Sequence, residues 1–171
     1  LAIAKNLASF CGKVTVITYL GEKKEELDFF KKNLERNINF KFLSKKKSPT
    51  IIKTRFVDDI NSNKLMGVQV LNDKLIDTPQ ENQLKNIFNK EIKKNHLVIV
   101  SDYGHGLITD KIAKLIMNKS KFLAVNAQLN AANIGFHTIS KYKKSNLSII
   151  NENELRHAMR DKESALNLLA S

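Results

Sequence analysis

The segment that decides the fold is residues 97–106, which read LVIVSDYGHG. Its first four residues, Leu97–Val100, are all apolar, which is typical of a short strand buried in a parallel sheet. Polar residues and glycines follow at once, so the strand is expected to end and a loop, Ser101–Ile108, to begin. In open parallel sheets, ligands bind beyond the carboxyl ends of the strands. The segment therefore predicts an α/β fold and indicates where to look for a site.

The same alternation of strands and helices extends to both sides of this segment. We expect further strands at 14–19, 39–43, 121–125 and 147–150. We expect helices at 1–10, 23–36, 80–94, 109–118 and 152–169. Strand–helix–strand units at this spacing imply a mainly parallel sheet with helices on its faces.

Residues 50–72 depart from this alternation and predict an inserted β-hairpin. Thr50–Val57 alternates, Asp58–Asn63 is turn-like, and a second strand follows. Lys53 and Arg55 share one face of the first strand. The simplest interpretation is a solvated face, and the alternative is a lid that closes over an anionic substrate. Because an isolated two-stranded ribbon is poorly stable, the hairpin could also mediate homodimerisation.

The net charge of +12 would favour nucleic-acid binding, but the basic residues argue against it. Lysine dominates and is spread along the chain, whereas base readout and phosphate forks favour arginine. A positive field would equally steer nucleotides and sugar phosphates towards the protein. A non-catalytic basic module that binds polyanions or a partner protein remains the alternative function.

The sequence also bears on where in the cell the protein is expected. The longest apolar runs fall well short of the ~18 residues of a membrane span, and no signal peptide is visible, so we expect no membrane association. Cys11 is the only cysteine, which fits a reducing, cytoplasmic setting. The sequence opens inside an apolar helical pattern without a capping residue, so we expect the chain to be an internal segment of a longer protein.

Three loops leave predicted strand ends. In the first, Asp102 places a carboxylate beside Gly104 and Gly106, either to contact a ligand or to accept N–H groups in a tight turn. His105 is expected to face solvent. In the second, Asn151 and Glu154 form a capping-box pattern, and the same pair could order water and magnesium near phosphates.

The third loop, 126–144, is long and rich in amides, which suit sugar hydroxyls and adenine edges because they both donate and accept hydrogen bonds. Its candidate residues are Asn126, Gln128, Asn130, Asn133 and His137.

These motifs together resemble the PfkB/ribokinase family of carbohydrate kinases. Residues 4–21 resemble the end of the first family signature, and Asn151-x-x-Glu154 matches the Asn-x-x-Glu motif. Lys53-Thr54-Arg55-Phe56 and the loop at 101–106 resemble the kinase domain of bifunctional heptose kinase/adenylyltransferases (ADP-heptose synthases). The stretch from Val125 through Gly135-Phe136 to Tyr142 resembles proteins that fuse a nucleotidyltransferase-like domain to a PfkB-like domain.

The resemblance implies a ribokinase-like three-layer αβα fold, truncated at both ends, in which 1–171 is a partial domain and 50–72 a β lid. It implies transfer of the ATP γ-phosphoryl group, with Mg²⁺, to a sugar or sugar-phosphate hydroxyl. Asn151 and Glu154 would lie near magnesium and phosphate, Lys53 and Arg55 on the lid, and Asp102, Asn126 and Gln128 by the substrate.

Two family features are absent from the sequence. These are the opening Gly-Gly region, which helps to bind the sugar, and the Gly-Ala-Gly-Asp motif, which supplies the catalytic aspartate. No residue here can therefore be named as the general base, and we expect the isolated chain to be inactive.

Overall fold

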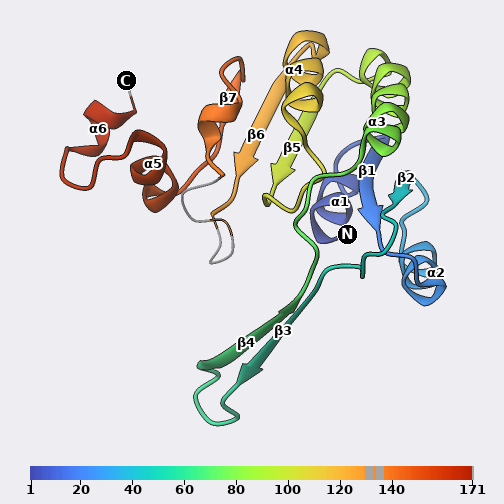
Figure 1. Ribbon diagram of the computed structural model, residues 1–171, viewed down its shortest axis with the longest axis horizontal. Coiled ribbons are helices and arrows are strands. Elements are labelled where there is room, and N and C mark those ends of the chain that lie inside the picture. Colours follow the sequence, from blue (N-terminus) through green and yellow to red (C-terminus); the bar gives the residue numbers. More distant parts are fainter. Residues whose placement is uncertain (130–132, 134–136, 171) are drawn as a thin grey trace. The chain divides into compact units, whose positions relative to one another are not determined.

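The computed structural model describes residues 1–129, 133 and 137–170 (Figure 1). Asn130 and the pair Gly135-Phe136, which the sequence analysis used, lie outside the described residues. The chain divides into two compact units, Leu1–Asp73 and Lys74–Ser171, and each has its own parallel sheet. No helix among the described residues is both long and apolar enough to cross a membrane.

The first unit begins with a parallel strand pair and its helices. Its elements are α1 (Ala2–Ala8), β1 (Val14–Leu20), α2 (Lys24–Lys32) and β2 (Ile38–Ser44). The two strands pair over their whole length. Leu20 and Leu43 are almost completely buried near the carboxyl ends of the strands. The amide of Asn37 donates to the backbone oxygens of Ala8 and Cys11, which ties the end of α1 to the start of β2.

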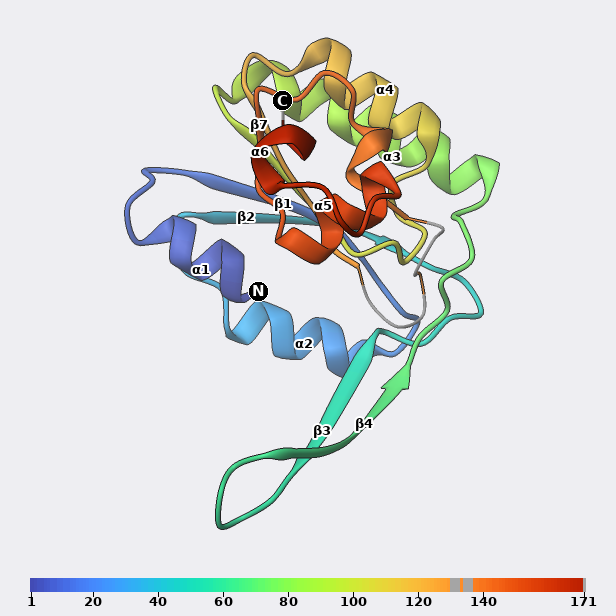
Figure 2. The ribbon, with the colours of Figure 1, turned by 90° about the vertical axis from the view of Figure 1, so that its left-hand side faces the viewer.

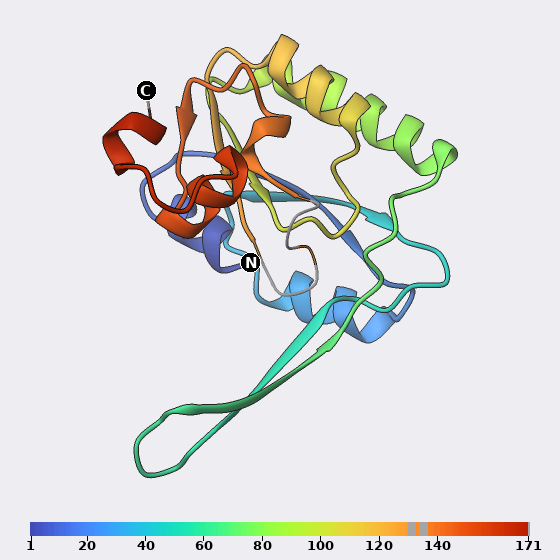
Figure 3. The same ribbon diagram turned by 60° about the vertical axis from the view of Figure 1, so that its left-hand side comes forward.

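The predicted hairpin is present as β3 (Ile52–Val57) and β4 (Lys64–Val70), a long ribbon closed by a turn (Figures 2 and 3). Every residue of both strands is exposed. Directly opposed residues share a face of a ribbon, so the pairing separates two kinds of side chain. One face is mainly apolar, and it comprises Ile52, Thr54, Phe56, Met66, Val68 and Val70. The other face carries Lys53, Arg55 and Gln69.

Both ends of the hairpin are fastened to the carboxyl ends of β1 and β2. The hydroxyl of Thr50 accepts from the N–H of Gly21 at 2.8 Å and donates to the Glu26 carboxylate at 2.6 Å. On the other side, the buried Lys45 ammonium donates to the backbone oxygen of Asn72 at 2.6 Å. A Cβ on Gly21 would lie 2.2 Å from the Thr50 nitrogen, so only glycine allows this approach.

The second unit contains a three-stranded parallel sheet in the order β5-β6-β7. Its strands are β5 (Val98–Asp102), β6 (Leu123–Ala127) and β7 (Leu147–Ser148). Its helices are α3 (Thr78–Glu91), η1 (Ile92–Lys94), α4 (Asp110–Lys119), η2 (Ile139–Lys141), α5 (Glu152–Met159) and α6 (Leu166–Leu169). The helices α3 and α4 lie side by side over the sheet (Figure 3), and a 2.6 Å hydrogen bond from Thr109 to Glu81 joins them.

Strand alternation gives this sheet two different faces. Val100, Asp102, Val125 and Ala127 share one face, and all four are buried. On the other face, Ile99 is 42% exposed. Ser101 and Asn126 lie opposite each other in register on that second face, and both are half-buried.

The single helix predicted at 152–169 is wrong, because the structure has two shorter helices there. Arg160 adopts a left-handed conformation with φ 56°, which ends α5. The Asp161 carboxylate then accepts from the N–H groups of Glu163 and Ser164, both at 2.9 Å, and holds a turn. These bonds lower the pKa of Asp161 to about 2.

Candidate functional site

The carboxyl ends of β5, β6 and β7 bring three of the predicted residues to one edge of the second sheet. Asp102 ends β5, Asn126 lies opposite Ser101 near the end of β6, and Asn151 follows β7. The Asn126 amide donates to the backbone oxygen of Ile149 at 2.7 Å, which joins the two later strand ends. The prediction of a shared edge agrees with the structure, although Asp102 and Asn126 emerge on opposite faces of the sheet.

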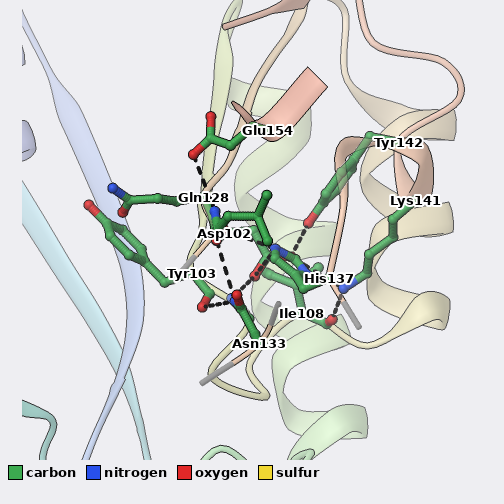
Figure 4. Close-up of polar contacts among 11 residues, drawn as sticks. Asp102, Tyr103, Ile108, Gln128, Asn133, His137, Lys141, Tyr142 and Glu154 are labelled. Atoms are coloured by element: carbon green, nitrogen blue, oxygen red, sulfur yellow. Dashed lines mark hydrogen bonds and ion pairs between the residues drawn. The ribbon is translucent and has the colours of Figure 1, made fainter. Parts of the chain in front are cut away.

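The Asp102 carboxylate is buried and lies at the centre of a polar network (Figure 4). Its Oδ1 accepts from the N–H of Gly104 at 3.0 Å, and its Oδ2 accepts from the Tyr142 hydroxyl at 2.5 Å and from the Lys141 ammonium at 3.2 Å. Burial and the nearby carboxylate raise the pKa of Tyr142, so its hydroxyl remains a donor. The arrangement fixes the segment at 141–142 against the end of β5. A direct substrate contact for Asp102 stays a prediction.

The loop after β5 turns back on itself at Gly104 and Gly106, which have φ values of 69° and 84°. The positive φ of Gly104 favours glycine, and a Cβ there would also lie 2.4 Å from the side-chain amide nitrogen of Asn133. The expectation that His105 faces solvent is wrong, since only 7% of this residue is exposed. Its ring stacks on Tyr103, with centroids 6.3 Å apart.

Asn151 and Glu154 form the predicted capping box at the start of α5. Asn151 Oδ1 accepts from the N–H of Glu154, and Glu154 Oε2 accepts from the N–H of Asn151, both at 2.9 Å. Glu154 Oε1 also accepts from the N–H of Leu129 at 3.2 Å, which sequence reasoning missed. The buried Glu154 therefore ties the loop after β6 to α5, while Asn151 is exposed. Their role near magnesium stays a prediction.

The amides of the third loop hold the two neighbouring strand ends together. The backbone N–H of Gln128 donates to the backbone oxygen of Asp102 at 2.8 Å. The Asn133 amide donates to the backbone oxygens of Tyr103 at 2.9 Å and of Gln128 at 3.4 Å. His137 Nε2 lies 3.1 Å from the Asp102 backbone oxygen. Part of the amide content of this loop is thus used for structure.

Lys53 and Arg55 lie in the first unit, on the polar face of the hairpin, and both are exposed. The structure describes them within that unit alone. Their prediction as lid residues stays open.

Among the described residues, no group of three or more His, Cys, Asp or Glu side chains could hold a metal ion directly. The oxygens of Asn151 and Glu154 already accept backbone N–H groups. Such oxygens retain further lone pairs, so the pair fits a water-mediated contact with Mg²⁺, an ion that usually keeps several of its waters.

A comparison with solved structures identifies the fold. The structure of ribokinase from Giardia lamblia matches with a TM-score of 0.59 and 17% sequence identity, and the match covers 97% of this chain and 52% of that one. The fold is therefore a ribokinase-like α/β fold with mainly parallel sheets, as the sequence predicted.

Sequence comparison finds similarity to one group of bifunctional proteins. The chain is 26% identical over 155 residues to bifunctional protein HldE from Campylobacter jejuni, covering 91% of this chain and 31% of that protein. Bifunctional protein HldE from a Nitratiruptor species is 25% identical over 118 residues, covering 69% of this chain and 25% of the relative. The chain thus spans about a quarter to a third of the length of these curated relatives. No family model matches it.

These relatives and the ribokinase match confirm the resemblance to PfkB-type kinases of the heptose kinase/nucleotidyltransferase group, at low sequence identity.

Proposed function

We propose that this chain is part of an ATP-dependent sugar kinase that transfers the γ-phosphoryl group of ATP to a hydroxyl of a sugar, most simply a sugar phosphate. The observation that carries the proposal is the shared edge of β5, β6 and β7, which gathers Asn126, Gln128 and Asn151 in a ribokinase-like fold. The similarity to bifunctional HldE proteins supports it.

The proposed roles follow the chemistry of each side chain. Asn151 and Glu154 position magnesium and phosphate through water, while Lys53 and Arg55 on the hairpin neutralise a substrate phosphate. Asn126 and Gln128 line the acceptor site. Asp102 holds the rim of that site through its buried network. Catalysis would rest on positioning and charge neutralisation, as in phosphoryl transfer generally.

The isolated 171-residue chain should not turn over substrate, because the sequence lacks the motif that supplies the general base in this family. Incubation with Mg-ATP and a panel of sugars and sugar phosphates should release no ADP above the background hydrolysis. Sugar-dependent ADP release by the pure chain would contradict this expectation.

The kinase proposal is tested with the protein expressed from its whole reading frame and two variants of Asn151. Asn151→Ala loses the helix cap, at a cost of about 1 kcal/mol in the free energy of unfolding, whereas Asn151→Asp keeps it. Both variants should lower kcat by about tenfold or more, because phosphate positioning needs the neutral amide. Wild-type protein that releases no ADP with any sugar would overturn the proposal. Full activity of Asn151→Asp would restrict Asn151 to capping.

The enzyme would work in the cytoplasm, where ATP is available and Cys11 remains reduced. It would form a homodimer through the apolar face of the hairpin, since both strands of this ribbon are exposed throughout. The alternative function is a non-catalytic basic module that binds polyanions or a partner protein, which the net charge of +12 favours.

A further inference from the structure

Tyr103 is an aromatic residue that has no role in the predicted site. It follows the last residue of β5, at the edge where the predicted site residues meet. It is 37% exposed, although its ring stacks on the buried His105. A large aromatic side chain that stays exposed beside polar groups is a common feature of sites that bind small molecules.

Tyr103 and Gln128 are the residues that directly follow the last paired residues of β5 and β6, Asp102 and Ala127. Ser101 and Asn126 are directly opposed on one face of the sheet, and Tyr103 and Gln128 come two residues later on the same two segments. In the view of Figure 4, both side chains lie on the side away from Tyr142. The Asn133 amide, which contacts the backbone oxygens of both residues, confirms that the two segments are adjacent.

Both residues are held by a preformed frame. The loop that carries Tyr103 is fixed by the hydrogen bond from Gly104 to the Asp102 carboxylate and by the stacked His105 ring. The backbone of Gln128 is fixed by its 2.8 Å bond to the Asp102 oxygen. Groups that are ordered before binding lose less entropy when a ligand arrives, so this pair is suited to recognition.

The two side chains offer complementary chemistry for a sugar. The negative face of an aromatic ring attracts the weakly positive C–H groups of a sugar ring, and an amide can both donate to and accept from neighbouring hydroxyls. Glu154, a proposed phosphate-side residue, binds the N–H of Leu129, directly after Gln128. An acceptor sugar beside Tyr103 and Gln128 would therefore lie next to the residues proposed to position the phosphoryl group.

We propose that Tyr103 and Gln128 form the platform that binds the acceptor sugar ring and that Tyr103 determines the preference for sugar phosphates over simple phosphate. This inference rests on the proposed kinase function and adds a recognition surface to it.

The test measures, by calorimetry, the binding of a heptose phosphate, glucose 6-phosphate, inorganic phosphate and Mg-ATP to the protein expressed from its whole reading frame and to four variants of it. Tyr103→Leu should weaken binding of at least one sugar phosphate by about three- to tenfold, whereas Tyr103→Phe should remain within about twofold of wild type. Gln128→Glu should weaken it similarly, because the added charge repels the phosphate. Phe122→Leu is the matched control, since Phe122 is 43% exposed before the start of β6, at the other end of the strand. Inorganic phosphate binding should not change in Tyr103→Leu.

Three other outcomes would overturn the inference, and each has a different consequence. If wild type binds a sugar phosphate and both Tyr103→Leu and Gln128→Glu bind it equally well, the platform is wrong and the kinase proposal stands. If Tyr103→Leu weakens only Mg-ATP, the residue serves the nucleotide instead. If the wild-type protein expressed from its whole reading frame binds no sugar phosphate, the platform is also wrong. ADP release by the whole protein judges the kinase proposal separately.

Discussion

At the residue scale, Asp102 shows how one side chain can organise an edge of the molecule. It is 5% exposed and accepts from a backbone N–H, a tyrosine hydroxyl and a lysine ammonium. Two of these donors, Lys141 and Tyr142, come from a segment about forty residues later in the chain. A buried carboxylate with charged and neutral donors stabilises the fold only while these partners are present.

We therefore predict that Asp102→Asn lowers the free energy of unfolding by about 1–3 kcal/mol, because the amide NH₂ cannot accept from the Tyr142 hydroxyl or the Lys141 ammonium. Urea unfolding followed by circular dichroism measures this change. Asp59→Asn, at an exposed position in the hairpin turn, serves as the control and should stay within about 0.5 kcal/mol of wild type. Equal stability of the two variants would contradict the role given to Asp102.

The sequence predicted where Asp102, Asn126 and Asn151 lie, because strand ends can be read from apolar runs and the ends of parallel strands share an edge. It did not predict which way the loop side chains point. His105 lies between Gly104 and Gly106, which both have positive φ, and Gly104 packs against Asn133 and His137, some thirty residues away. Such long-range contacts leave no local pattern.

At the element scale, the hairpin is an unusual ribbon because its two faces differ while both strands are exposed. Val68 lies on the apolar face, opposite Thr54, and Gln69 lies on the polar face, opposite Lys53. Alternation in the sequence predicted these faces for β3, since a period of two is readable in a short exposed strand. The period could not reveal the break after Met159, where a single left-handed residue ends α5.

We predict that Val68→Lys keeps the protein monomeric at concentrations at which wild type dimerises. Burying a charged lysine in an apolar contact would cost free energy. Sedimentation velocity over a range of concentrations measures the equilibrium. Gln69→Lys adds the same charge to the neighbouring position and should leave dimerisation within about threefold of wild type. A wild-type protein that stays monomeric throughout would disprove dimerisation through the hairpin.

At the scale of the whole molecule, the feature to consider is the net charge of +12. The second unit carries exposed lysines on its outer helices and the segments that follow them, namely Lys90, Lys93, Lys94, Lys111, Lys114, Lys119 and Lys121. Several of their acidic neighbours are already paired, as in the contacts of Lys94 with Glu91 and of Lys111 with Glu81. A surface of this kind attracts any polyanion at low salt.

We predict that single-stranded DNA binds only as a non-specific polyanion. Its affinity should fall by at least about thirtyfold between about 50 and 200 mM salt, with no preference among sequences and competition from Mg-ATP. Fluorescence anisotropy with labelled oligonucleotides measures this. Tight, sequence-dependent binding at physiological salt that ignores Mg-ATP would instead favour the basic binding module.

Gly21, which packs against the backbone at Thr50 where the hairpin begins, has a consequence for comparisons with distant relatives. Even one methyl group at position 21 would collide with the backbone at Thr50. Substitution of Gly21 is therefore restricted for as long as the hairpin is attached to the sheet in this way. Among distant sequences of the same fold, a larger residue aligned with Gly21 should therefore mark proteins in which the ribbon is attached differently or has been lost.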